Sequence, residues 1–118
     1  MKKKIFFITA TRADFGKLKS LIKITKKSKN FDVKIIVTGM HNMKEFGNTF
    51  YEVKKNFGNQ SIRFANQKPG DDLNEILKNT IFHFSKIVLK HKPDLIVVHG
   101  DRIETLACAL VGSMSHIL

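Results

Sequence analysis

Residues 97–105 have the sequence Val-Val-His-Gly-Asp-Arg-Ile-Glu-Thr, which indicates more about the fold than any other stretch. An apolar run ends at a glycine, and charged residues follow before a helical pattern begins at Ile103. In an open parallel sheet, the carboxyl ends of the strands and the helix N-termini after them form the crevice where ligands bind. A strand over Asp94–His99 therefore places Asp101 and Arg102 on the rim of such a crevice.

The same alternation of strand and helix recurs along the chain. Apolar runs predict further strands over Lys4–Thr9, Val33–Thr38 and Ser61–Phe64. Helices are expected over Phe15–Thr25, Thr49–Asn56, Asp71–His91 and Ile103–Ser115, with Leu21 and Leu73 on buried faces. Strands that alternate with helices favour a parallel sheet with right-handed crossovers and helices on both faces. We therefore predict a Rossmann-like α/β fold with three layers, α/β/α.

The length and composition fit one domain over residues 1–118. A chain of 118 residues with 42% hydrophobic residues is large enough to bury a core. Ser115–Leu118 resembles the start of another buried strand, so we expect the domain to be incomplete. The apolar run Ile5–Ile8 is too short for a signal peptide or a membrane span. Cys108, the only cysteine, excludes an internal disulfide and is expected to be a buried structural thiol in a cytoplasmic protein.

The net charge of +11 lies entirely within residues 1–68. A basic segment of this kind suggests nucleic-acid binding, because neutralised phosphates dominate such affinity. Most of the cations are lysines, however, and their spacing is typical of a solvated helix face. We favour an ordinary exposed surface and expect neither a nucleic-acid nor a membrane partner.

A second candidate site follows the first strand, where residues 9–16 are Thr-Ala-Thr-Arg-Ala-Asp-Phe-Gly. A dinucleotide fingerprint needs three glycines, and only Gly16 is present, so the NAD and FAD binding modes are not expected. Arg12 beside the positive end of a helix suits a phosphate or carboxylate ligand. An exposed arginine beside a helix that is capped by Asp14 explains this turn equally well.

A third corner follows the second strand, at residues 38–47. His41 in this loop has the chemistry of an acid, a base or a hydrogen-bond donor to a substrate, although a lone loop histidine is more often simply exposed. His99 either orients the neighbouring corner or packs against it. No two histidines have helical metal-ligand spacing with a carboxylate nearby, so we predict no zinc site.

Together, these corners resemble the N-terminal part of the hydrolysing UDP-N-acetylglucosamine 2-epimerase family. The resemblance rests on Thr-Ala-Thr-Arg-Ala-Asp-Phe-Gly-Lys-Leu at residues 9–18, Thr-Gly-Met-His at 38–41, Phe-Gly-Asn-Thr at 46–49 and Val-His-Gly-Asp-Arg-Ile-Glu-Thr at 98–105. The related non-hydrolysing enzymes usually carry Thr-Arg-Pro-Glu in the first turn and Gly-Asp-Thr in the last. Ala13 and Arg102 therefore favour the hydrolysing branch.

The resemblance implies that this chain is the N-terminal half of a two-domain GT-B enzyme whose C-terminal domain is absent. Such enzymes eliminate UDP from a UDP-sugar to give a glycal and then add water at the anomeric carbon. They release the 2-epimeric free sugar, for example N-acetylmannosamine, which is used in sialic or nonulosonic acid synthesis. The resemblance implies no metal or redox cofactor, and a homo-oligomer at full length.

The resemblance also implies roles for individual residues. Arg12 and Arg102 would contact the uridine diphosphate, with Gly16 at a nucleotide-binding position and His41 close to the sugar. Asp101 would be one of the catalytic carboxylates, acting in proton transfer or orienting the group that does. Further catalytic groups are expected beyond residue 118, so the chain is predicted to be inactive alone.

Two other function classes also fit parts of the sequence. A stand-alone nucleotide- or polyanion-binding module would explain the basic first half, and it predicts salt-sensitive binding with no preference for UDP. A flavodoxin-like regulatory domain would explain the alternation, but it should carry an acidic cluster at the first strand end. Only Asp14 is present there, so we rank this class last.

Overall fold

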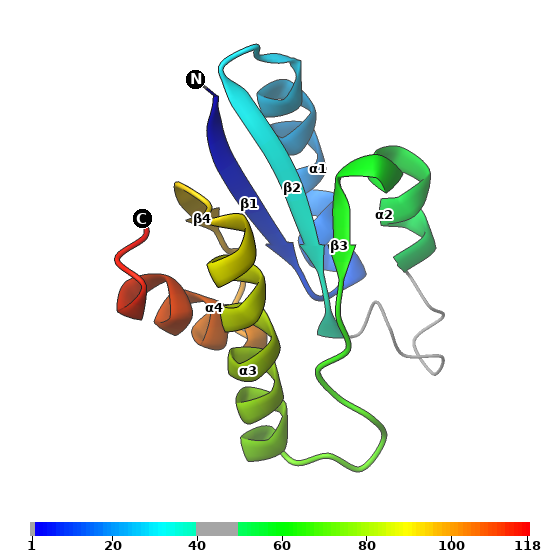
Figure 1. The fold of residues 1–118 in the computed structure, drawn as a ribbon. Helices are drawn as coiled ribbons and strands as arrows, with labels where there is room; N and C mark the ends of the chain where they lie inside the picture. Colours follow the sequence, from blue (N-terminus) through cyan, green and yellow to red (C-terminus); the bar gives the residue numbers. More distant parts are fainter. Residues whose placement is uncertain (1, 40–49) are drawn as a thin grey trace.

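Four parallel strands form one sheet in the computed structural model, which describes residues 2–39 and 50–118. The strands are β1 (Lys3–Thr9), β2 (Phe31–Val37), β3 (Ser61–Arg63) and β4 (Leu95–Val97). Their order is β3-β2-β1-β4, so the first strand lies between the second and the fourth (Figure 1). The sheet therefore grows to one side of β1 through β2 and β3, and β4 is added on the other side.

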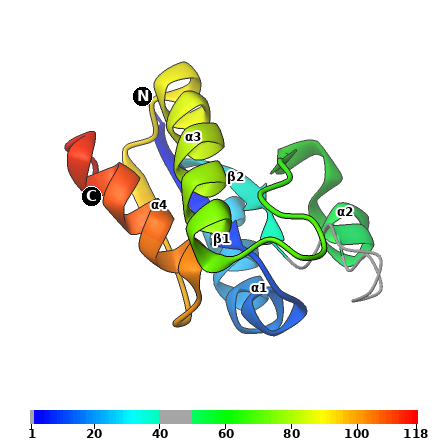
Figure 2. The same cartoon turned by 90° about the horizontal axis from the view of Figure 1, so that it is seen from below.

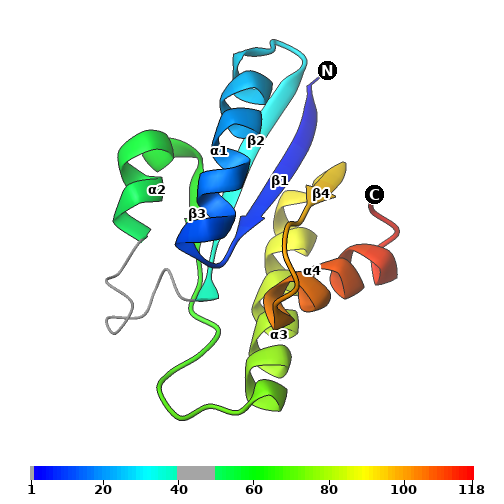
Figure 3. The same ribbon diagram turned by 180° about the vertical axis from the view of Figure 1, so that it is seen from behind.

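Helices cover both faces of this sheet. They are α1 (Arg12–Lys27), α2 (Phe50–Phe57), α3 (Leu73–His91) and α4 (Ile103–Met114), with the short 3-10 helix η3 (Gly58–Gln60) before β3. The pair α3 and α4 lies on the face turned to the viewer in Figure 1, and α1 and α2 lie on the other face, seen in Figure 3. From below, the strands lie between α1 and α3 (Figure 2). The predicted Rossmann-like α/β/α fold is confirmed.

The central strand is buried on both faces, which explains its uninterrupted apolar run. Ile5 and Phe7 pack in the core beneath α1 and α2. Phe6 and Ile8 belong to the opposite core, beneath α3 and α4. Strands of parallel sheets are commonly apolar at successive positions for this reason. Seven residues of β1 pair with β2, from Lys3 with Phe31 to Thr9 with Val37, whereas only three pair with β4.

The first helix begins earlier than the sequence predicts, at Arg12 rather than Phe15. Thr11 is the N-cap, because its hydroxyl oxygen accepts a hydrogen bond of 3.1 Å from the backbone N–H of Asp14. The expectation that Asp14 caps this helix is wrong, because Asp14 lies inside its first turn. Leu21 and Leu73 are 48% and 67% exposed, so their expected burial is also wrong. The buried stripe of α3 instead consists of Ile76, Thr80, Phe84 and Val88.

Residues 115–118 do not form the predicted strand. The backbone N–H groups of Ser115 and Ile117 donate to carbonyls of Val111 and Gly112, which folds this segment back on the end of α4. Its last carbonyl, of Leu118, nevertheless accepts a 2.7 Å hydrogen bond from the N–H of Ile96 in β4.

The outer surface of α1 carries the predicted lysine face. The exposed members are Lys23, Lys26 and Lys27, and Lys29 just after the helix is exposed too. Within residues 2–39 and 50–118, no helix has both the length and the apolar character needed to cross a bilayer.

Candidate functional site

The order of the strands reverses between β1 and β4, and the loops that follow these two strands lie at the same edge of the sheet. Phe7 in β1 pairs with Val97 in β4, so the two strands end side by side. A reversal of this kind leaves a crevice at the carboxyl ends, and ligands of open α/β folds bind there. The corners singled out at residues 9–16 and 98–105 are therefore neighbours.

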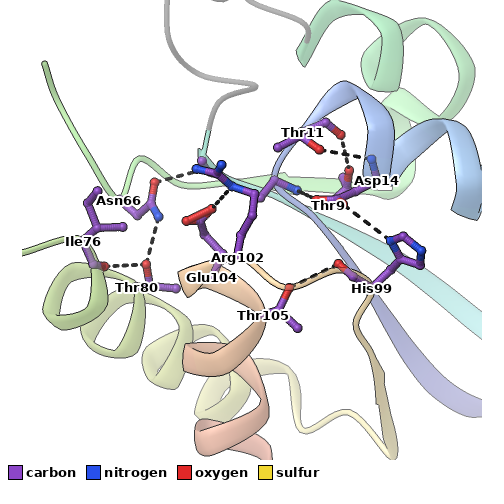
Figure 4. Close-up of polar contacts among 12 residues, drawn as sticks. Thr9, Thr11, Asp14, Asn66, Ile76, Thr80, His99, Arg102, Glu104 and Thr105 are labelled. Carbon is purple, nitrogen blue, oxygen red and sulfur yellow. Dashed lines mark hydrogen bonds and ion pairs between the residues drawn. The ribbon is translucent and has the colours of Figure 1, made fainter. Parts of the chain in front are cut away.

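The corner after β1 is closed by a reciprocal pair of hydrogen bonds. The side chain of Thr11 accepts from the N–H of Asp14, and the Asp14 Oδ2 atom accepts from the N–H of Ala10 at 3.3 Å (Figure 4). This is close to a capping box, in which the third helical residue reaches back to the helix entrance. The Thr-x-x-Asp spacing is the sequence signal that identifies it.

Asp14 also links the first corner to the last one. Its Oδ1 atom lies 3.6 Å from Nδ1 of His99, whose side chain is 39% exposed. A Cβ atom on Gly100 would lie 3.2 Å from the same Oδ1 atom, and Gly100 has a φ of +106°, so both packing and backbone favour glycine. The Thr105 hydroxyl donates to the carbonyl of His99 at 3.2 Å. Nδ1 of His99 has no hydrogen-bond partner among the described residues, and Thr105 contacts its backbone, so an orienting role for the imidazole stays a prediction.

Glu104 is the functional candidate that the sequence pattern did not single out. Its side chain is 1% exposed, and its Oε1 atom accepts a 3.1 Å hydrogen bond from Nε of Arg102. Among the described residues, the Oε2 atom has no hydrogen-bond partner although it is buried. A carboxylate in the first turn of an apolar helix, two residues after an arginine, is the signal in the sequence.

Burial and the charge of Glu104 raise the pKa of the Cys108 thiol, which is buried as predicted.

The corner after β2 is held by a buried polar chain. The N–H of Gly39 donates to Oδ1 of Asn66 at 3.0 Å, and the Asn66 amide donates to the Thr80 hydroxyl at 2.9 Å. That hydroxyl donates in turn to the carbonyl of Ile76 at 2.6 Å (Figure 4). The end of β2 is therefore anchored to α3. His41, the candidate sugar contact, lies outside the described residues.

The other predicted site residues fall into two pairs. Arg12 forms an exposed ion pair of 3.0 Å with Glu52 of α2, and Gly16, one turn later in α1, has open space where a Cβ would lie. A shallow cavity of about 350 Å³ lies there, lined by Phe15, Gly16, Lys19, Glu52, Lys55 and Asn56. Asp101, which is exposed, and Arg102 line a different cavity of about 400 Å³ with Leu73, Ile103 and Leu106.

Two further observations concern another cavity and metal binding. A cavity of about 500 Å³ near Pro93 and Ile117 lies at the start of β4, away from all of these residues, and its lining has no acidic or histidine side chain. Within the described ranges, no three His, Cys, Asp or Glu residues are grouped closely enough to bind a metal ion. Arg12 and Arg102 lie at the N-termini of α1 and α4 at the carboxyl edge of the sheet, which suits an anionic ligand.

A parallel α/β sheet of this order, with helices on both faces, defines the class of Rossmann-like α/β domains. Comparison with family models identifies the family. The model described as UDP-N-acetylglucosamine 2-epimerase matches residues 23–118. The chain belongs to the UDP-N-acetylglucosamine 2-epimerase family.

Individual relatives agree with this assignment. The chain is 42% identical over 113 residues to UDP-N-acetylglucosamine 2-epimerase of Neisseria meningitidis serogroup B, covering 96% of this chain and 30% of that protein. It is 35% identical to the GDP/UDP-N,N'-diacetylbacillosamine 2-epimerase (hydrolyzing) of Campylobacter jejuni, covering 98% of this chain and 31% of the relative. The Methanocaldococcus jannaschii UDP-GlcNAc 2-epimerase, solved with UDP-GlcNAc and UDP, superimposes with a TM-score of 0.81 at 32% identity, covering 97% of this chain and 30% of that one. This chain thus spans about 30% of the length of these relatives.

Proposed function

We propose that this chain is the N-terminal Rossmann-like half of a GT-B enzyme, a hydrolysing UDP-N-acetylglucosamine 2-epimerase whose remaining domain follows residue 118. One observation carries the proposal: the carboxyl ends of the neighbouring strands β2, β1 and β4 lie at one edge of the sheet, so the described parts of the corners after them, around Gly39, Ala10 and Gly100, are close together. The contacts of Asp14 with His99 and of Gly39 with Asn66 support it. So does the complex of the Methanocaldococcus jannaschii relative with UDP-GlcNAc and UDP.

In the proposed reaction, the bond from C1 to UDP and the C2–H bond break to give the glycal, with the C2 proton passing to a base. Water then adds its hydroxyl to C1, and a proton returns to C2 from the opposite face to give the 2-epimer. Arg102 and Arg12 bind the diphosphate, with Gly16 at the nucleotide and His41 beside the sugar. Negative charge grows on the β-phosphate as the bond breaks, and guanidinium groups stabilise that charge better than they stabilise the intact substrate. Asp101, exposed at the tip of the β4 corner, acts in proton transfer at the sugar ring or orients the group that does.

The hydrolysing type is supported by Ala13 and Arg102, which differ from the pattern typical of non-hydrolysing relatives. Two relatives that carry the word hydrolyzing in their names are 32% and 35% identical to this chain. UDP-N-acetylglucosamine and a UDP-diacetamido-trideoxy sugar are both suitable substrates. The free 2-epimeric sugar would serve sialic or nonulosonic acid synthesis in the cytoplasm.

The proposal includes two statements about the whole enzyme. The full-length protein is a homo-oligomer. The 118 residues alone do not turn over UDP-sugar, because catalytic groups of the second domain are needed, but they retain weak affinity for UDP. An assay of UDP release with the 118-residue chain should give no product, and measurable turnover would contradict this part of the proposal.

Titration of UDP into the 118-residue chain, followed by amide NMR shifts, tests the binding site. We expect shifts at Ala10, Asp14, Gly100 and Arg102, and weaker binding after Arg102→Ala. Shifts that avoid both corners would overturn the proposal. Binding to nucleic acid that is sensitive to salt and shows no preference for UDP would instead favour the polyanion-binding module suggested by the basic first half.

A further inference from the structure

We propose that Glu104 is a positioning residue, which sets the guanidinium of Arg102 so that its two terminal amino groups face the diphosphate. This inference rests on the proposed function, since it needs an anionic ligand at the β4 corner. A buried carboxylate beside an anion site would normally repel the ligand, and this role explains why Glu104 is present there.

The burial of the two side chains is unequal. Glu104 is 1% exposed, whereas the Arg102 side chain is 34% exposed. The carboxylate is therefore more deeply buried than the guanidinium, and Arg102 lines the cavity that it shares with Asp101. Because Oε2 of Glu104 has no partner in the described part of the chain, Arg102 is the one described cation that compensates this buried charge.

The contact uses only one edge of the arginine. Its Nε atom donates to Glu104 Oε1 at 3.1 Å. A guanidinium has five N–H donors in a rigid plane, so fixing Nε also fixes the direction of the two terminal amino groups. A phosphate accepts two parallel hydrogen bonds from the terminal amino groups of a guanidinium, and the strength of binding depends on the orientation of these groups.

Glu104 is closely approached by the backbone at the end of β2. A Cβ atom built on Gly39 would lie 3.1 Å from Glu104 Oε1 and 2.8 Å from the Cβ of Ala10. The β2 corner therefore lies at Gly39 close to the same carboxylate oxygen that accepts from Arg102. Burial of the Glu104 side chain and this close neighbour restrict its movement, as a fixed partner for Arg102 requires.

For Glu104→Gln, charge repulsion alone and the positioning role predict opposite changes in UDP affinity. Removal of a negative charge near an anion should tighten UDP binding, because repulsion falls. Loss of the orienting ion pair should weaken it instead, and we expect the UDP dissociation constant of the 118-residue chain to rise about tenfold. Glu75→Gln is the matched control, because Glu75 is also paired with a cation at 3.0 Å in the first turn of a helix but is exposed.

A double-mutant cycle separates positioning from a general structural defect. If Glu104 acts through Arg102, Glu104→Gln should have no further effect on UDP affinity in an Arg102→Met background. Arg102→Lys replaces Arg102→Met in the cycle if the latter does not fold, since it keeps a cation but lacks the fork. The Nε–H resonance of Arg102 should be sharp in the unliganded chain and should broaden in Glu104→Gln, a readout that does not require ligand.

The possible outcomes distinguish the two proposals. If the unsubstituted chain binds no UDP, the proposed function fails. If it binds UDP, Arg102→Met weakens binding, and Glu104→Gln leaves it unchanged or tightens it, the proposed function stands and the positioning role is overturned. Equal losses from Glu104→Gln with and without Arg102 would also overturn it.

Discussion

Replacement of Gly39 by alanine should destabilise the fold strongly, and the structure gives two separate causes. The backbone at Gly39 has a φ of +63°, where an L-residue is strained by about 1–2 kcal/mol. The added Cβ would lie 2.8 Å from the Cβ of Ala10 and 2.9 Å from its carbonyl oxygen, closer than real Cβ atoms approach. Forcing an extra carbon into such a packed region costs about 1–3 kcal/mol.

The two costs add to about 2–5 kcal/mol, a large part of the roughly 5–15 kcal/mol by which a domain is usually stable. Urea unfolding followed by circular dichroism measures the change. With the usual dependence on urea, the midpoint for Gly39→Ala should fall by more than about 1 M.

Two other glycines provide matched controls. Gly70 has a φ of +92° but open space around it, so Gly70→Ala should cost only the backbone strain of about 1–2 kcal/mol. Gly16 lies within α1 with open space, and Gly16→Ala should stabilise the chain by about 0.5–1 kcal/mol. If Gly39→Ala costs no more than Gly70→Ala, the close contact between the first two corners is not real.

Three further predictions concern other parts of the fold. Thr11→Ala should lower the free energy of unfolding by about 1 kcal/mol in urea, through loss of the α1 cap, and no change would contradict the cap. Cys108 should resist iodoacetamide at about pH 8 in the native chain and react in concentrated urea, as mass spectrometry would reveal, because burial raises its pKa. Burial, with the charges of Lys4, Lys90 and Lys34, lowers the pKa of His91 from 6.5, so the unfolded chain binds a proton more readily. The free energy of unfolding should fall as the pH drops from above 6.5 through the folded-state pKa, and His91→Gln should reduce that fall in pH-dependent urea titrations.

The sequence predicts the elements and layers well because its apolar pattern is strong. The four strands and four helices occur near their expected positions, since runs such as Phe6 to Ile8 have no amphipathic alternative. Leu21 and Leu73 were misplaced because a helical repeat tells which side of a helix is apolar but not how far the sheet extends beneath it. Leu73 lies in the first turn of α3, and its side chain is 67% exposed.

The candidate site was predictable in its position and less so in its contacts. The strand-end corners follow from the alternation of strands and helices, which places Asp101 and Arg102 at the rim. The close approach of Gly39 to Glu104 joins residues that are far apart in the sequence, and no local spacing pattern predicts such a contact. The pairing of Arg12 with Glu52 also depends on where α2 packs.

The unequal pairing of the central strand has a consequence for motion at the binding edge. Seven residues of β1 are joined to β2, but only three to β4, and the residues of β4 are only partly buried. Local opening occurs at the lowest free energy where contacts are fewest. Strand β4 should therefore open at a lower free energy than β1. Hydrogen exchange should be faster at amides after β4 than at those of β1, and a bound nucleotide should slow it most on the β4 side.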